Sequence, residues 1–152
     1  MSTLSTRGEY SITTDKTRFD IEAIHAFLAQ SYWSPGIPIS VVERAISNSL
    51  CFGLFDGDRQ IGFARMITDR ATFAYLADVY IAEPYRGKGL AKWLLETIHS
   101  LDDLQGLRRI MLATRDAHEL YKQFGYTELA DPSRLMERHN PTVYSRDTER
   151  AR

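Results

Sequence analysis

The stretch "YIAEPYRGKGLAKWLLETI", residues 80–98, decides the fold. It starts as a β-like apolar run, passes through a proline and two glycines, and continues with apolar residues at helical spacing. The turn between the predicted strand and the predicted helix therefore contains Arg86, Gly87, Lys88 and Gly89. The position of these four residues raises the question of what the turn binds.

The turn has the features of an anion site. The first turn of a helix leaves backbone N–H groups without partners, and the helix dipole adds partial positive charge there. Gly87 and Gly89 have no side chains to keep a phosphate away, while Arg86 and Lys88 add cationic contacts. A strand-to-helix turn that needs glycine only for its geometry, with both cations solvated, explains the same residues, and the turn alone does not decide between the two.

Two well-known phosphate-binding patterns do not fit this turn. The spacing G-x-x-x-x-G-K-[ST] of nucleoside-triphosphate loops is absent. A dinucleotide fingerprint needs a third glycine where Lys92 stands, and an acidic residue about 20 positions on. The acidic candidate, Asp116, comes too late in the chain.

Length and composition indicate one globular domain, residues 1–152, with a core at about 9–139 and a polar tail at 141–152. The net charge is −1, from 19 Lys and Arg against 20 Asp and Glu, which excludes a global electrostatic pull on nucleic acid or membranes. The single cysteine, Cys51, rules out an intrachain disulfide, and the histidines show no metal-ligand spacing. No signal-peptide-like or membrane-spanning run is evident, so we expect a cytoplasmic protein without nucleic-acid or membrane partners.

Hydrophobic periodicity predicts the elements in chain order. The first half has a strand at 10–15, a helix capped by Asp20, a short helix capped by Ser40, and a hairpin of strands 50–55 and 60–68. The second half has a buried strand at 71–82, a helix after Gly89, a strand at 108–114, a short helix from Asp116 to Phe124 ended by Gly125, and closing strands at 126–129 and 134–139. A meander followed by crossover helices predicts an α+β domain with a mixed sheet and helices on both faces.

The segment "RGKGLA", Arg86 to Ala91, resembles the [QR]-x-x-G-x-[GA] signature of the GCN5-related N-acetyltransferases, the GNAT family. The predicted element order is similar to that family from about Glu9 to His139. A second block, "LATRDAHELYKQFGY" (residues 112–126), is similar to the family segment that carries a tyrosine on a short helix, followed by a glycine and an aromatic residue. Thr114 departs from the asparagine that many relatives have there, although its hydroxyl can still form a hydrogen bond.

The resemblance implies a three-layer α/β/α fold with a mostly antiparallel sheet, and an N-acetyltransferase that uses acetyl-CoA and no metal. It implies backbone contacts from the central strand to the pantetheine arm, with an oxyanion contact from the N–H near Ile81. The cofactor-binding residues that it implies are Val79, Ile81, Arg86, Gly87, Lys88, Gly89, Leu90, Ala91, Thr114 and Ala117.

Acetyl transfer from a thioester requires a neutral amine, a stabilised oxyanion and a protonated leaving thiolate. By resemblance, Tyr121 is the candidate acid, and its phenol is protonated at neutral pH. Its spacing with Ala117, Leu120 and Phe124 fits a core-facing stripe equally well. Asp78 is a carboxylate within the apolar run "YLADVYIA" and is the candidate base; the alternatives are a carboxylate that braces a loop or one that attracts a cationic substrate.

Tyr32 and Trp33 lie in the Pro- and Gly-broken segment between the first two helices, from which family members line the acceptor pocket. Aromatic residues in an exposed loop often mark a binding site, although covering the core explains both residues equally well. Together with the short chain, they favour a small-molecule amine as acceptor, with direct transfer in a ternary complex. A protein amine and a non-catalytic CoA-binding domain are the alternatives. A homodimer is compatible with the resemblance, since dimers are common in the family.

Overall fold

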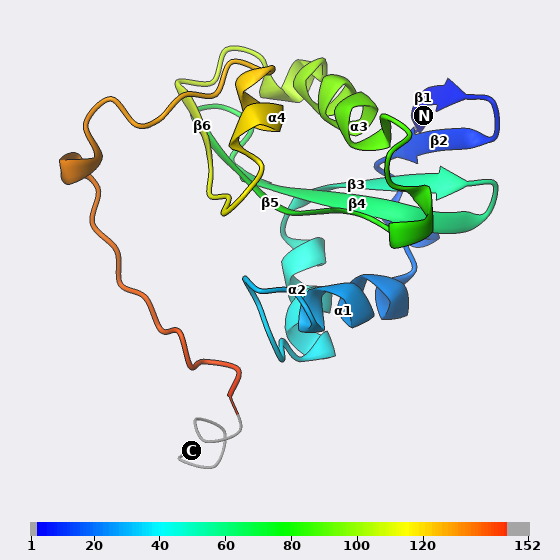
Figure 1. Cartoon of the computed structure of the whole chain (residues 1–152), viewed down its shortest axis with the longest axis horizontal. Helices are drawn as coiled ribbons and strands as arrows, with labels where there is room; N and C mark the ends of the chain where they lie inside the picture. The colour runs from blue at the N-terminus through cyan, green and yellow to red at the C-terminus, as the bar shows by residue number, and fades with distance from the viewer. Residues whose placement is uncertain (1–2, 146–152) are drawn as a thin grey trace.

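The computed structural model describes residues 3–145 as a six-stranded sheet with helices on both faces (Figure 1). The strands are β1 (Thr3–Arg7), β2 (Tyr10–Thr13), β3 (Leu50–Asp56), β4 (Arg59–Thr68), β5 (Phe73–Ile81) and β6 (Arg109–Leu112). The helices are α1 (Ile21–Ala29), α2 (Ile39–Ser47), α3 (Leu90–His99) and α4 (His118–Lys122), with short 3₁₀ turns at Lys16–Arg18, Glu83–Tyr85, Asp102–Leu104 and Pro132–Arg134. The predicted α+β, three-layer α/β/α class is confirmed.

The strands lie in the sheet in the same order as in the chain, β1 to β6. The neighbours from β1 to β5 pair antiparallel, and β5 pairs with β6 in parallel. The crossover from β5 to β6 contains α3, as a parallel connection requires. The sheet is therefore mixed and mostly antiparallel, as expected.

Two apolar clusters fill the space on the two faces of the sheet. One cluster joins α3 to the sheet through Trp93, Leu94 and Ile98. The other joins α1 and α2 to the opposite face, with Ile24 and Val42 among its members. Figure 1 shows α3 and α4 on one side of the sheet and α1 and α2 on the other.

Local sequence signals explain several boundaries. The Asp20 side chain accepts a hydrogen bond from the N–H of Ala23 at 3.0 Å and caps α1, as predicted. The hairpin between β3 and β4 turns at Gly57, whose φ is +59°. Helix α4 ends at Lys122, two residues before the predicted end at Phe124, and Gly125 follows it with φ at +89°.

Two predicted caps are wrong. Helix α2 begins at Ile39 with Pro38 in the cap position, two residues earlier than a cap at Ser40 would allow, because the Pro38 carbonyl already accepts from the N–H of Val42. Helix α4 has Ala117 in the cap position in place of Asp116, and the Thr114 hydroxyl accepts from the Ala117 N–H at 3.1 Å.

The sequence prediction also missed β1 and placed two closing strands that do not form. Residues 126–129 and 134–139 contain no strand; this part of the chain is irregular, apart from the turn at Pro132–Arg134. The polar tail predicted at 141–152 lies partly outside the described residues, since the description ends at Ser145.

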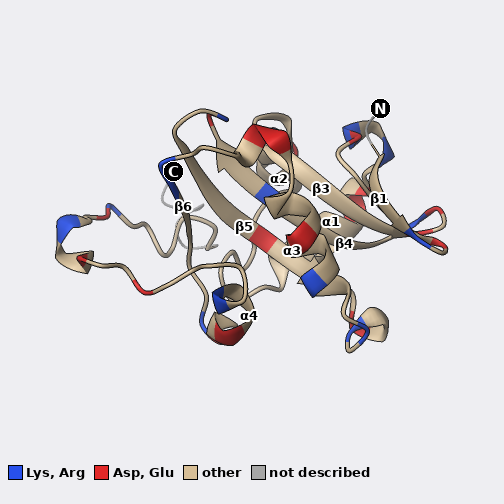
Figure 2. Cartoon of the chain, turned by 90° about the horizontal axis from the view of Figure 1, so that it is seen from above, with Lys and Arg blue, Asp and Glu red and all other residues tan. Residues whose placement is uncertain are grey.

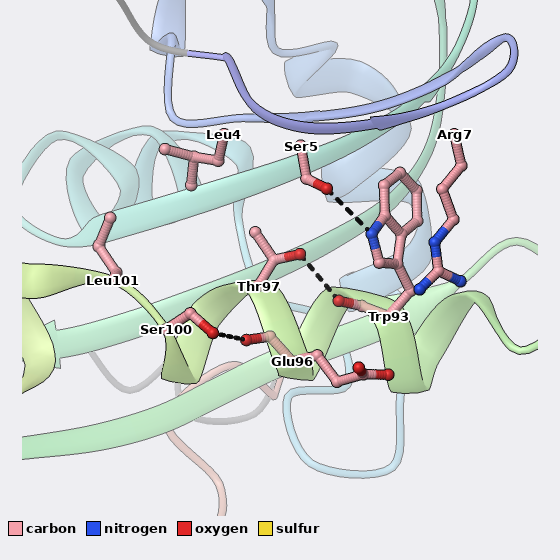
Figure 3. Close-up of a pocket in the computed structure, with 8 residues that line it drawn as sticks. All are labelled: Leu4, Ser5, Arg7, Trp93, Glu96, Thr97, Ser100 and Leu101. Carbon is pink, nitrogen blue, oxygen red and sulfur yellow. Dashed lines mark hydrogen bonds between the residues drawn. The ribbon is translucent and has the colours of Figure 1, made fainter.

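Strand β1 contacts α3 through Trp93, whose indole N–H donates to the Ser5 hydroxyl at 3.1 Å (Figure 3). The Arg7 guanidinium lies over the Trp93 ring, 4.9 Å from its centroid. A shallow groove of about 380 Å³ lies between these two elements. The contact fixes the first strand on the sheet although that strand has little apolar character of its own.

Charges of both signs are spread along the chain in Figure 2, in agreement with the net charge of −1. The arrangement gives no single-sign face in that view.

Candidate active site

A bulge in β5 shapes the centre of the site. Phe63 of β4 faces Tyr80, while Arg65 faces Ala77, so β5 contains an extra residue between these pairs. Asp78 takes up the irregularity with φ at +58°, a left-handed conformation that few residues other than glycine, asparagine and aspartate tolerate. The bulge re-aims the Asp78 side chain away from the regular alternation of the strand.

The Asp78 carboxylate is held by two donors. Its Oδ2 accepts from Arg65 Nε at 2.7 Å, and its Oδ1 accepts from Trp33 Nε1 at 2.9 Å. The side chains of Arg65 and Asp78 are 17% and 10% exposed, so the ion pair is largely screened from water. Arg65 also donates to the Ser49 hydroxyl at 3.2 Å. Asp78 thus connects the α1–α2 segment to the sheet.

The partner strands β5 and β6 separate beside this bulge. Their parallel pairing covers only Phe73 to Leu76 on β5, with Leu76 facing Leu112 as the last pair. From Ala77 onward, the edge of β5 that would face β6 has no sheet partner in residues 3–145.

Strand alternation shows which backbone groups face this opening. The N–H of Ala82 bonds to Ile61 on the β4 side at 2.7 Å, whereas the Ile81 carbonyl accepts from Arg86 Nε at 2.9 Å. The N–H and C=O of one strand residue point the same way, so the Ile81 N–H also points away from β4. Val79 lies two residues earlier and has the same orientation by alternation.

The turn into α3 has open backbone donors. Gly87 and Gly89 have φ values of +78° and +75°, and a Cβ at either position would meet no atom within 4 Å. The first intrahelical bond of α3 runs from the Trp93 N–H to the Gly89 carbonyl at 3.1 Å, which leaves the N–H groups of residues 90–92 free of helical partners. Because the Leu90 side chain is buried in the core, Leu90 and Ala91 can offer a ligand their backbone groups. Lys88 is exposed.

A cavity of about 720 Å³ runs from the opening between β5 and β6 to the α1–α2 segment. Its apolar wall comes from Leu28, Ile37, Val42, Ala45 and Ile46. The site residues predicted from the sequence that line it are Tyr32, Trp33, Asp78, Val79, Thr114, Ala117 and Tyr121. Ile81 and residues 86–91 do not line it; they lie farther along β5 and at the start of α3.

Tyr121 lies on α4 and lines the cavity, although it also packs against the core cluster. Burial, with a smaller contribution from Tyr32, raises the pKa of the Tyr121 phenol above its usual value. The ring meets Tyr126 edge-on, with centroids 5.9 Å apart. The phenol is therefore protonated throughout the physiological pH range.

Behind Tyr121, His99 and Tyr126 are joined by a hydrogen bond. His99 Nδ1 lies 2.6 Å from the Leu95 carbonyl, which can only accept, so this nitrogen carries the proton. The other nitrogen, Nε2, then accepts from the Tyr126 hydroxyl at 2.8 Å. Burial lowers the pKa of His99, which keeps the imidazole neutral.

Tyr32 closes one side of the cavity. Its hydroxyl accepts from the Arg115 N–H at 3.1 Å, and the Arg115 guanidinium lies 3.9 Å from its ring centroid. The ring also meets Trp33 edge-on at 5.1 Å between centroids. Tyr32 and Trp33 are 47% and 41% exposed, so they form the outer wall of the site.

Sequence reasoning missed Arg65, Arg115 and Tyr144, which all line the cavity. Arg65 did give a signal, since it stands as a lone charge in the apolar run "IGFARMIT" one strand away from Asp78. Arg115 and Tyr144 follow no pattern that distinguishes them from ordinary surface residues. The single cysteine, Cys51, is fully buried, and burial raises the pKa of its thiol to about 12.

Within residues 3–145, no group of three or more His, Cys, Asp or Glu side chains is arranged to hold a metal ion. None of the helices in the same range has the length and apolar character needed to cross a membrane.

Comparison with known proteins gives a consistent result. Residues 47–128 match the family model described as "Acetyltransferase (GNAT) domain". A Gibberella zeae protein that carries the name of an acetyltransferase is 34% identical over 139 residues, covering 76% of this chain and 77% of the relative.

Solved structures agree. A Xanthomonas campestris pv. campestris protein assigned to the GNAT family is 48% identical, with a TM-score of 0.88 over 90% of this chain and 96% of that one. A Clostridium acetobutylicum protein solved with acetyl-CoA is 14% identical, with a TM-score of 0.61 over 86% and 94% of the two chains, and shows likeness of fold alone.

Proposed function

Because the chain belongs to the GNAT family of acetyltransferases, whose co-substrate is acetyl-CoA, we propose that it transfers the acetyl group directly to the primary amine of a small molecule. The observation that carries the proposal is the continuous cavity of about 720 Å³ between the β5–β6 opening and the α1–α2 wall. Its volume lies within the range of small-molecule sites, and its apolar wall suits an amine with an apolar body.

The chain's groups suit the binding of acetyl-CoA at this opening. The open turn at Gly87 and Gly89, with the free N–H groups of residues 90–92, suits a pyrophosphate. The edge at Val79 and Ile81, with Thr114 and Ala117 opposite, suits the pantetheine arm. Arg86 also holds the turn in place, because its Nε donates a hydrogen bond to the Ile81 carbonyl at the end of β5.

In the proposed mechanism, the neutral amine attacks the thioester carbonyl and forms a C–N bond. The N–H of Ile81 stabilises the oxygen as negative charge develops. As the C–S bond breaks, the Tyr121 hydroxyl gives its proton to the sulfur, and the proton that leaves the attacking nitrogen restores the phenol through solvent. The products are an N-substituted acetamide and the free thiol of CoA.

For Asp78, the contacts favour the role of a brace over that of a base. Both carboxylate oxygens already accept hydrogen bonds, from Arg65 and from Trp33. In this role Asp78 positions Trp33 on the acceptor side, and the ammonium proton of the substrate is lost to solvent before attack. Tyr32 and Trp33 contact the acceptor.

Direct transfer is supported by the state of the single cysteine. An acyl-enzyme route needs an accessible nucleophile, but Cys51 is fully buried with a raised thiol pKa. The proposal includes a cytoplasmic location, where acetyl-CoA is available.

The test is thiol release from acetyl-CoA with a panel of small primary amines, compared with peptide N-termini and lysine peptides. We expect turnover with small amines that have an apolar body, and intersecting lines in initial-rate plots. Tyr121→Phe should lower kcat by about 10²-fold or more while the affinity for acetyl-CoA stays near wild type. The matched control is Tyr10→Phe, a partly buried tyrosine that packs on Tyr85 outside the cavity.

Equal kcat values for Tyr121→Phe and wild type would make Tyr121 a packing residue. Binding of CoA without turnover over the whole panel would favour a CoA-binding domain, and turnover of peptides alone would favour a protein acceptor.

A further inference from the structure

Two basic and two acidic side chains line the cavity, namely Arg65, Asp78, Arg115 and Asp116. Arg65 and Asp78 form an ion pair with each other, so they leave no net charge on the part of the wall where they lie. The charges that an acceptor meets in the cavity therefore come from Arg115 and Asp116.

The Arg115 guanidinium has donors to offer a ligand. It forms no ion pair and donates no hydrogen bond among residues 3–145, in contrast to the backbone N–H of the same residue, which donates to the Tyr32 hydroxyl at 3.1 Å. A guanidinium has five N–H donors and keeps its charge at every physiological pH. An anionic group on the acceptor would give these donors a partner.

Tyr32 holds this guanidinium in a fixed orientation. The guanidinium carbon lies 3.9 Å from the centroid of the Tyr32 ring. At this separation no N–H group can stand between the carbon and the ring, so the flat face of the guanidinium meets the ring and its N–H groups point outward in their own plane. A side chain that is already oriented loses less conformational freedom when a ligand binds.

Arg115 and the candidate acid Tyr121 belong to the same site. Arg115 lies in the segment between β6 and α4, and Tyr121 lies on α4. Both line the cavity together with Tyr32, whose phenol contributes to the raised pKa of Tyr121. Because the cavity has the volume of a small-molecule site, one acceptor can present its amine near Tyr121 and a second group to Arg115.

The acidic neighbour, Asp116, has a different effect on an acceptor. It is exposed and forms no ion pair within the described part of the chain. Its carboxylate attracts the ammonium group that every alkylamine carries in water at neutral pH. Asp116 therefore does not distinguish an amine with an anionic group from one without, whereas the Arg115 guanidinium does.

We propose that the acceptor is an amino acid with an apolar side chain, and that the Arg115 guanidinium binds its carboxylate. The inference rests on the proposed acetyl transfer and names the substrate class of the same site. A guanidinium and a carboxylate match through two parallel N–H···O hydrogen bonds. The apolar wall from α1 and α2 receives the side chain of the substrate.

The reaction balances with the groups already named. The nitrogen of the amino acid forms a C–N bond to the acetyl carbon, and the C–S bond of the thioester breaks. The amino acid in its ammonium form and acetyl-CoA give an N-acetylated amino acid, the free thiol of CoA and one proton, which solvent takes up.

The test measures thiol release with leucine and with leucinamide, two acceptors of the same body that differ in the carboxylate. The carboxylate raises the pKa of the neighbouring amine, so kcat/KM is calculated for the neutral amine and the pKa difference then drops out. Wild type should prefer leucine by about tenfold or more, the factor expected for a charge-assisted hydrogen bond. Phenylalanine and phenylalaninamide repeat the comparison with a larger apolar body.

The variant Arg115→Gln should lower the ratio of leucine to leucinamide by about tenfold or more. Arg115→Lys keeps the charge without the paired donors and should give an intermediate ratio. Both acceptors are measured with the same protein, so a loss of folding or of CoA binding lowers both rates and leaves their ratio unchanged. The matched control is Arg7→Gln, which removes an arginine that lies over Trp93 outside the cavity and should keep the wild-type ratio. Asp116→Asn should not lower the ratio either.

The outcomes separate the substrate class from the activity. Absence of turnover with every amine, with or without a carboxylate, would refute the acetyl transfer and this inference with it. Turnover without an advantage for leucine over leucinamide would overturn the substrate class and leave the acetyl transfer standing. An advantage for leucine that Arg115→Gln leaves unchanged, or that Arg7→Gln reduces equally, would overturn the role of Arg115.

Discussion

Replacing Asp78 by asparagine separates the two roles that a carboxylate in this site could have. Asparagine keeps the size of the side chain and tolerates the left-handed backbone at φ +58°, so the change acts on charge and hydrogen bonding. The amide has a single acceptor oxygen, whereas Arg65 and Trp33 each donate to a separate carboxylate oxygen. One of the two donors therefore loses its partner.

The separation of 2.7 Å between Arg65 Nε and Asp78 Oδ2 sets the size of the effect. At an effective dielectric constant of about 20, the attraction at this distance is about 6 kcal/mol. Desolvation of both groups offsets most of it, and a charge-assisted hydrogen bond contributes a net of about 2 kcal/mol. For a domain of this length, that loss lowers Tm by about 4–8 °C.

The assay is thermal unfolding of Asp78→Asn together with steady-state kinetics at several pH values. As a brace, Asp78→Asn should unfold at the lower temperature, raise the KM of the acceptor and keep kcat within about tenfold of wild type, with an unchanged pH profile. Asp103→Asn is the matched control, since its ion pair with Arg70 is on the surface and contributes less than about 1 kcal/mol. A wild-type Tm combined with a loss of about 10²-fold or more in kcat is the result for a general base, and it would refute the brace.

Two further predictions concern the turn into α3 and the buried histidine. Gly89→Val should raise the Kd for CoA about tenfold or more in calorimetric titration, because a side chain there covers the free backbone N–H groups at the start of α3. The control is Gly57→Val, which introduces similar backbone strain at φ +59° and should leave this Kd unchanged. Because burial lowers the pKa of His99, the unfolded chain binds more protons below its own pKa of about 6.5. The contribution of His99 to stability should therefore be constant above about pH 7 and fall as the pH drops below about 6.5. His99→Gln should flatten this acid-side slope, and a slope identical to wild type would contradict the assignment.

Local signals predicted the parts of the fold that local chemistry determines. The Asp20 cap, the hairpin turn at Gly57 and the glycine-rich entry to α3 each depend on residues close in sequence. The same approach missed β1, because Thr3–Arg7 gains its place through the distant Trp93 and has little apolar pattern of its own. It also placed strands at 126–129 and 134–139, where the local pattern is strand-like but the described residues pair with no other strand.

The candidate site likewise has a part that the sequence predicted and a part that it did not. Sequence resemblance indicated the residues around the opening, such as Tyr121, Thr114 and Val79, and the fold brings these to one cavity. The contacts of Asp78 could not be predicted, because they join residues 13 and 45 positions apart through a bulge with a left-handed residue. No local pattern encodes such a contact.

Because the strands lie in the sheet in the same order as in the chain, the sheet can be extended strand by strand while the protein is synthesised. During synthesis, each new strand from β2 to β6 meets a partner that has already left the ribosome, and no strand has to be inserted between two others. In the proposed function, the residues of α1 to β5 that line the acceptor side leave the ribosome before Thr114, Ala117 and Tyr121, which follow β6 or belong to α4 and its cap. A nascent or truncated protein that lacks β6 and α4 would therefore have the acceptor wall without the groups that we assign to the pantetheine arm and to protonation of the leaving thiol.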